Sequence, residues 1–147
     1  MRDFDGIEIL LVDRDESFAA FASRVIAKSN AGNKLFWAKD STEALDFIAC
    51  AGAFERRDPR ELPRLVLLDI EMPRPAGFSV LQKLKGDKRT QPVPVVVMTA
   101  SNQGGDVDEC YRLGVNAYII KPSGFTELTE VIASVSRFWL LVNQVPQ

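Results

Sequence analysis

Five short, nearly uninterrupted apolar runs alternate with longer segments whose apolar residues recur at helical spacing. The runs cover residues 7–12, 35–38, 65–68, 93–98 and 117–120. Runs of this length and composition suit strands that are buried on both faces, as in a parallel sheet covered by helices. Strands that alternate with helices in this way imply right-handed crossovers. The sequence therefore predicts an α/β fold built on a doubly wound, five-stranded parallel sheet.

Four of the predicted strands end in a polar residue that can handle a phosphate or a metal ion: Asp13, Asp69, Thr99 and Lys121. Open α/β sheets bind their ligands at the carboxyl ends of the strands, so we expect these side chains at one edge. Two carboxylates are hard oxygen ligands suited to Mg²⁺, and an ammonium supplies positive charge for a phosphate. Because a carboxylate can also be the nucleophile in aspartyl-phosphate chemistry, the pattern favours a phosphoryl-accepting aspartate.

The composition of the chain excludes several other classes of function. Its 147 residues fit one domain, and they include no histidine, which removes His-based acid–base catalysis and most zinc sites. The net charge of −2 gives no basis for nucleic-acid binding. No apolar stretch is long enough to span a membrane, and the N-terminus lacks the layout of a signal peptide. We therefore expect a cytoplasmic protein whose two cysteines are reduced thiols.

The spaced motifs closely resemble those of the receiver domains of two-component response regulators. The phosphoacceptor motif of that family matches residues 68–73, with Asp69 as the acceptor, and Gly77 follows it. The switch hydroxyl matches Thr99, the lysine matches Lys121 before a proline, and the switch aromatic matches Tyr118. The resemblance implies a flavodoxin-like (CheY-like) sheet with strand order 2-1-3-4-5. It also implies a single receiver domain over residues 1–147, with a core at about 6–136.

The resemblance further implies phosphotransfer from the phosphohistidine of a sensor histidine kinase to Asp69. Mg²⁺ would be bound by the side chains of Asp13 and Asp69 and by the backbone carbonyl of Glu71. The chain would not be an enzyme beyond its own phosphoryl acceptance and autodephosphorylation. One departure concerns the metal: the family usually has two adjacent acids after the first strand, whereas Arg14 follows Asp13 here. Arg14 could weaken metal binding, turn to solvent or turn toward the phosphate, and Asp15 could compensate or point elsewhere.

The C-terminal segment predicts a long helix, from about residue 125 to about residue 142. Its apolar residues follow steps of three and four as one stripe of about 18 residues, or ~27 Å: Leu128, Val131, Ile132, Val135, Phe138, Trp139 and Val142. Such a patch, if exposed, would be large for a monomer. We therefore predict a homodimer in which Phe138, Trp139, Leu141 and Val145 pack on a second subunit.

Two further segments resemble one subgroup of the family. Residues 138–146 and an insertion at 51–63, which we expect to be an exposed loop, are similar to the small single-domain regulators of bacterial and cyanobacterial phytochrome kinases. The resemblance implies a red-light-sensing kinase as partner and a dimer through the last helix, whereas the composition gives no reason to expect a nucleic-acid or membrane partner. Two other interpretations are open. Asp13 and Asp15 also fit the D-x-D start of haloacid-dehalogenase-type phosphatases, and Arg14 fits a pseudo-receiver that is only an interaction or dimerisation module.

Overall fold

The computed structural model, which describes residues 6–29, 34–73 and 76–146, has a central parallel sheet of five strands. Its elements in chain order are β1 (Ile9–Val12), α1 (Glu16–Ser29), β2 (Leu35–Ala38), α2 (Ser41–Ala49), the 3₁₀ helix η1 (Gly52–Phe54), β3 (Leu65–Leu68), α3 (Ala76–Gly86), β4 (Val95–Thr99), α4 (Gly104–Arg112), β5 (Ala117–Ile120), α5 (Phe125–Arg137) and the π-helical turn η2 (Phe138–Val142). The strand order is β2-β1-β3-β4-β5, so the predicted doubly wound fold and its order 2-1-3-4-5 are confirmed.

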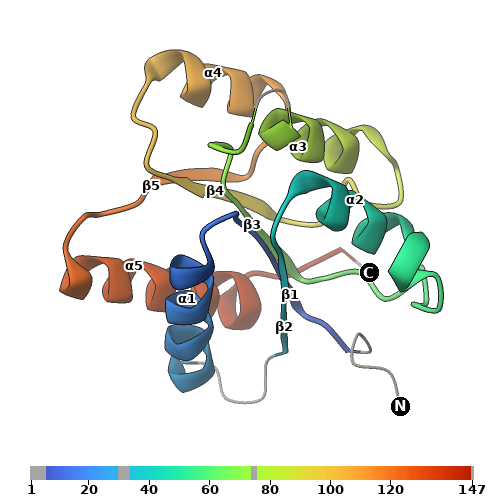
Figure 1. The fold of residues 1–147 in the computed structure, drawn as a ribbon, viewed down its shortest axis with the longest axis horizontal. Helices are drawn as coiled ribbons and strands as arrows, with labels where there is room; N and C mark the ends of the chain where they lie inside the picture. The colour runs from blue at the N-terminus through green and yellow to red at the C-terminus, as the bar shows by residue number, and fades with distance from the viewer. Residues whose placement is uncertain (1–5, 30–33, 74–75, 147) are drawn as a thin grey trace.

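Helices cover both faces of the sheet, with α1 and α5 on one face and α2, α3 and α4 on the other (Figure 1). Successive side chains of a strand point to opposite faces, so each strand contributes to two cores. Leu10 and Val12 of β1 belong to the core on the α2–α3 side, whereas Ile9 and Leu11 belong to the core under α1 and α5. This is why the strands show no alternation of apolar and polar residues.

Local residue chemistry fixes where several elements begin. Asp40 is the N-cap of α2, and its carboxylate accepts a hydrogen bond from the Glu43 N–H at 2.8 Å. The predicted start of the fourth strand, at Val93, is two residues too early. Val93 donates its N–H to the Thr90 carbonyl in a turn, and Pro94 has no N–H for the ladder. The strand therefore begins at Val95.

The prediction that residues 51–63 form an exposed loop is wrong in one respect. Arg57 is buried, with 6% of its surface exposed. Its guanidinium lies 3.7 Å from the centre of the Phe47 ring. It donates hydrogen bonds to the carbonyls of Phe47 and Glu61, at 2.5 and 2.8 Å. The insertion is therefore not wholly solvated, because Arg57 attaches it to α2.

The last helix departs from the predicted α-helical spacing beyond Arg137. In the turn η2 the Asn143 N–H bonds to the Phe138 carbonyl five residues back, so the helix widens. The next fully buried residue after the Val135–Ser136 pair is Leu140, whereas Phe138 and Val142 are 46% and 58% exposed. The extra residue per turn rotates the apolar side chains, which leaves part of the predicted stripe on the surface. Over the described ranges, none of the helices is both long and apolar enough to cross a membrane.

Candidate functional site

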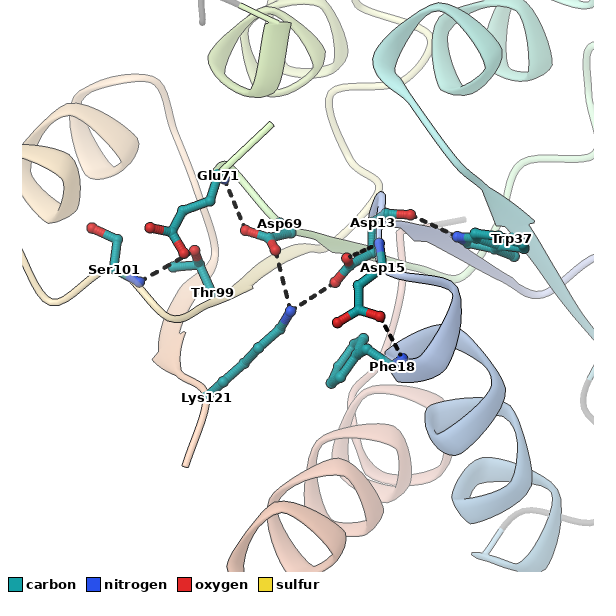
Figure 2. A network of polar contacts seen from close by, with 9 residues as sticks. All are labelled: Asp13, Asp15, Phe18, Trp37, Asp69, Glu71, Thr99, Ser101 and Lys121. Atoms are coloured by element: carbon teal, nitrogen blue, oxygen red, sulfur yellow. Dashed lines mark hydrogen bonds and ion pairs between the residues drawn. The ribbon is translucent and has the colours of Figure 1, made fainter. Parts of the chain in front are cut away.

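The parallel sheet brings the predicted site residues to the carboxyl edge of its strands. Val12 of β1 pairs with Leu68 of β3, so Asp13 and Asp69 follow neighbouring strands at the same level. Thr99 is the last residue of β4 and pairs with Ile120 of β5. Lys121, directly after β5, extends its long side chain across the edge toward β3 and β1 (Figure 2).

The ammonium of Lys121 bridges the two carboxylates. Its Nζ donates to Asp13 Oδ2 at 2.8 Å and to Asp69 Oδ2 at 3.1 Å. The exposed fractions of the three side chains are only 15% for Lys121, 1% for Asp13 and 10% for Asp69. The same Nζ lies 3.9 Å from the centre of the Phe18 ring on α1, at a distance that allows a cation–π contact. The site is therefore a buried ion triad with a net charge of −1.

Backbone N–H groups hold both carboxylates in place through Oδ1, the oxygen that Lys121 does not contact. Asp13 Oδ1 accepts the Asp15 N–H at 2.9 Å, and Asp69 Oδ1 accepts the Glu71 N–H at 2.8 Å. The indole Nε1 of Trp37 on β2 donates to the backbone carbonyl of Asp13 at 2.7 Å. The two acids are thus pre-oriented, so little reorganisation is needed when a ligand arrives.

Burial and the ion pairs act in opposite directions on the pKa values of Asp13 and Lys121. Burial raises the pKa of Asp13 above its usual range, and the hydrogen bond and charge of Lys121 only partly offset this. For Lys121, burial lowers the pKa, but the hydrogen bonds and charges of Asp13 and Asp69 outweigh it, so the pKa lies above its ordinary value. Lys121 is therefore held as a cation between the acids.

Thr99 and Tyr118 belong to a second group of contacts, which is centred on Ser101. The buried Thr99 Oγ1 accepts the Ser101 N–H at 3.4 Å (Figure 2). The Tyr118 hydroxyl donates to the Ser101 carbonyl at 2.9 Å, and the Ser101 hydroxyl donates to Asp106 Oδ2 at 2.6 Å. Burial raises the pKa of Tyr118, so it stays a hydrogen-bond donor. The structure thus joins the predicted hydroxyl and aromatic through the loop between β4 and α4.

Arg14 and Asp15 diverge from the ion triad. Asp15 Oδ1 accepts the Phe18 N–H at 3.2 Å at the start of α1, so its carboxylate is turned toward that helix (Figure 2). Asp15 therefore does not compensate for the missing adjacent acid. Arg14 is exposed and lines an open cleft of about 470 Å³ beside the triad. The other residues that line this cleft are Ile70, Glu71, Met72, Pro73, Gln103 and Asp106.

The oxygen donors at the carboxyl edge of the sheet fit a hard divalent cation, although only two carboxylates converge there. Asp13 and Asp69 converge, and the triad carries one surplus negative charge that a cation would offset. Within the described part of the chain, no group of three His, Cys, Asp or Glu side chains is arranged to hold a metal. Two carboxylates are still enough for Mg²⁺, which keeps several water ligands.

Sequence reasoning missed several residues that complete the site. Ser101 follows Thr99 by two positions, and its small polar side chain is typical of a loop. Trp37 and Phe18 looked like ordinary apolar residues of a strand and a helix. No signal in the sequence pairs Trp37 with a carbonyl or Phe18 with an ammonium, since both contacts depend on how β2 and α1 pack beside the edge.

Comparisons with known proteins agree with this geometry. The model of the response regulator receiver domain matches residues 9–133. The "Probable methanogenesis regulatory protein FilR2" of Methanothrix harundinacea is 32% identical over 97% of this chain and 89% of its own length. The response regulator Rcp1 of Synechocystis is 31% identical over 94% of this chain and 92% of its own length.

Solved structures of two relatives share the fold over nearly their whole length. The Mn²⁺-bound form of Rcp1 superposes with a TM-score of 0.86 at 29% identity and covers 95% of this chain and 98% of that one. The phosphorylated cyanobacterial phytochrome response regulator RcpA superposes with a TM-score of 0.87 at 27% identity. The match covers 95% of this chain and 97% of the RcpA chain. The chain belongs to the family of response regulator receiver domains.

Proposed function

We propose that this receiver domain accepts a phosphoryl group on Asp69 from the phosphohistidine of a sensor histidine kinase. Receiver domains serve as phosphoryl acceptors for such kinases rather than as enzymes with a separate substrate. In the transfer an Asp69 oxygen supplies the electron pair for a new P–O bond. The P–N bond to the kinase histidine breaks, and its electron pair leaves with the imidazole, which then takes up a proton. Autodephosphorylation would break the new bond with water.

The observation that supports this proposal most is the Lys121 bridge between the two buried acids. Lys121 can leave one carboxylate oxygen and neutralise the phosphoryl group that Asp69 gains. The Thr99 hydroxyl can then donate to a phosphoryl oxygen, and a movement of Thr99 reaches Tyr118 through Ser101, whose N–H bonds to Thr99 Oγ1 and whose carbonyl accepts from Tyr118. These roles make Thr99 and Tyr118 the switch residues of the site.

Mg²⁺ is the cation that we propose for the site, held by the side chains of Asp13 and Asp69 and by the backbone carbonyl of Glu71. When bound, it neutralises charge on the transferring group. The support is the oxygen donor set described above, together with a Mn²⁺-bound form of the relative Rcp1. The protein's own contribution is to keep Asp13 ionised beside Lys121 despite the burial that raises the pKa of Asp13.

A phytochrome-type kinase is the partner that we propose. The support is the likeness to RcpA, which is a phytochrome response regulator, over nearly the whole of both chains. Residues 1–147 would act as one receiver domain in the cytoplasm. We propose no nucleic-acid partner, because a net charge of −2 gives no reason to expect one.

A homodimer through the C-terminal segment is the second part of the proposal on partners. Phe138 and Leu141 are 46% and 62% exposed on the turn η2, beside the partly buried Trp139. Val145 lies in a groove with Pro92 and Pro94 at the other edge of the sheet. Burying such apolar side chains against a second copy would stabilise a dimer. Light scattering at micromolar concentration tests this, and a monomeric mass would reject it.

Two alternative functions can be weighed against the same residues. Family membership removes the haloacid-dehalogenase-type phosphatase, whose acid would be Asp15, a residue engaged at the start of α1. The pseudo-receiver is favoured by one observation, the exposed Arg14 where a second acid is usual. It predicts that beryllofluoride with Mg²⁺ does not bind.

Incubation with a small phosphodonor and Mg²⁺ tests the acceptor role directly. Intact-mass spectra should show one added phosphoryl group on the wild type and none on Asp69→Asn. An unmodified wild type would reject the proposal.

A further inference from the structure

Arg14 is a cation at the phosphoryl-acceptor cleft that the proposed function does not use. It lines the cleft with Glu71 and Asp106, and it directly follows Asp13 of the triad. Among the described residues the Arg14 side chain has no ion pair and no hydrogen bond. Arg57, Arg60 and Arg112, by contrast, are all engaged with acids or carbonyls. An exposed guanidinium without a partner thus borders the site where an anion is expected.

The backbone around Arg14 is fixed on both sides. The Asp13 N–H donates to the Ala38 carbonyl at 3.1 Å, and the Asp13 carbonyl accepts from Trp37 Nε1. The Asp15 N–H is tied to Asp13 Oδ1, and the Asp15 carboxylate is tied to α1. Arg14 is therefore the tip of a tight turn. Asp13 points into the triad, the exposed Asp15 bonds to the start of α1, and the Arg14 side chain lines the cleft.

We propose that Arg14 is a phosphate-contacting residue, and that it replaces part of the charge neutralisation that a divalent cation would otherwise provide at Asp69. This inference rests on the proposed function. A guanidinium presents donors in a planar fork that matches two phosphoryl oxygens. Its positive charge offsets part of the negative charge that the triad, Glu71 and Asp106 present at the cleft, which favours the approach of a phosphodonor anion. The same charge repels a metal ion bound between Asp13 and Asp69.

The proposal makes opposite predictions for metal and for phosphoryl ligands. Calorimetric titration of the full chain with Mn²⁺, without any phosphodonor, should give weak binding for the wild type. Arg14→Asp should bind Mn²⁺ at least about tenfold more tightly, because two units of charge change beside the metal. Arg24→Gln, a change at an exposed arginine of α1 outside the cleft, should bind as the wild type does. Equal affinity for Arg14→Asp and the wild type would overturn the inference.

Beryllofluoride, which mimics the phosphoryl group on Asp69, tests the direct contact. Fluorine NMR should show the wild-type adduct with a shallow dependence on Mg²⁺ concentration. Arg14→Gln should lose about tenfold or more in beryllofluoride affinity at low Mg²⁺, since one charge-assisted contact is removed. Arg14→Asp should form the adduct only when Mg²⁺ fills its tighter metal site, and not in the absence of Mg²⁺. Undiminished affinity in Arg14→Gln would overturn the inference and leave the acceptor role intact.

Two other outcomes separate this inference from the proposed function. An adduct that forms in Arg14→Asp but not in the wild type would mean that Arg14 blocks the site, which overturns both the inference and an active wild-type receiver. An adduct that forms in no variant, even though Arg14→Asp binds Mn²⁺, would reject Asp69 as an acceptor, and the phosphate contact with it.

Discussion

Replacing Lys121 with methionine should destabilise the protein, and the loss should depend on pH. Methionine has an unbranched side chain of similar length, but it lacks the charge that lies between Asp13 and Asp69 and over the Phe18 ring. Two carboxylates would then remain side by side at a buried edge, with only backbone N–H groups as partners.

The size of the loss follows from the contacts that disappear. The Lys121 ammonium makes two charge-assisted hydrogen bonds, at 2.8 and 3.1 Å, each worth about 1.5–3 kcal/mol. The desolvation of the lysine is relieved when it is removed, which offsets part of that sum. Removing one partner of a buried ion pair costs about 3–5 kcal/mol, so we expect a loss of about 3 kcal/mol in the free energy of unfolding near neutral pH.

The pH dependence has a definite sign. Burial already raises the pKa of Asp13 in the folded protein, and removing Lys121 takes away a group that lowers it. A folded-state pKa above the unfolded one gives a contribution to stability that is complete at low pH and is lost as the pH rises through the folded-state pKa. The cost of Lys121→Met should therefore shrink at acidic pH, by about 1.4 kcal/mol for each unit of added pKa shift.

Urea denaturation of the metal-free protein at about pH 8 and about pH 5 measures both quantities. Lys85→Met is the matched control: the Lys85 ammonium is also partly buried, but it donates only to the carbonyls of Gln91 and Val93. Its cost should be the same at both pH values. A cost for Lys121→Met that does not change with pH, or that is absent, would refute the account of the triad.

Three further substitutions test the surroundings of the site. Gly77→Ala should lower the free energy of unfolding by about 1–3 kcal/mol, because an added Cβ would lie 2.5 Å from the Ile70 carbonyl oxygen; an unchanged melting temperature would contradict this. Asp40→Ala should cost about 1 kcal/mol through the lost cap of α2, measured by urea denaturation, and no loss would disprove the cap. Arg57→Met should cost about 3 kcal/mol by stranding two carbonyls, whereas Arg60→Met at a fully exposed side chain should match the wild type. Equal midpoints for these two arginine variants would argue against the anchoring of the insertion.

The features that the sequence predicted correctly are those governed by local pattern and by topology. Strands buried on both faces need apolar residues throughout, so β1 and β3 could be located from composition alone. The edge strand β5 was located in the same way, although its residues are only half-buried or exposed. Once the strands are parallel, their carboxyl ends must share an edge, and this brings Asp13, Asp69 and Lys121 together. Specific contacts were not needed for that inference.

The features that the sequence did not predict depend on geometry that no pattern records. The charged residues of the insertion at 51–63 did not indicate that Arg57 would be buried, because its burial depends on the Phe47 ring being within reach. The helical period predicted an apolar stripe through Phe138, but a single π turn moved the burial to Leu140. Asp15 was an open question until its carboxylate was found at the start of α1.

The central claim is that Asp69 is the residue that gains the phosphoryl group. Borohydride reduces an aspartyl phosphate to homoserine, so reduction after phosphotransfer, followed by peptide mass spectrometry, identifies the acceptor by position. The account predicts homoserine at position 69 in the wild type and no homoserine in Asp69→Asn. Homoserine at Asp13 or at any other aspartate, or no homoserine at all, would contradict it.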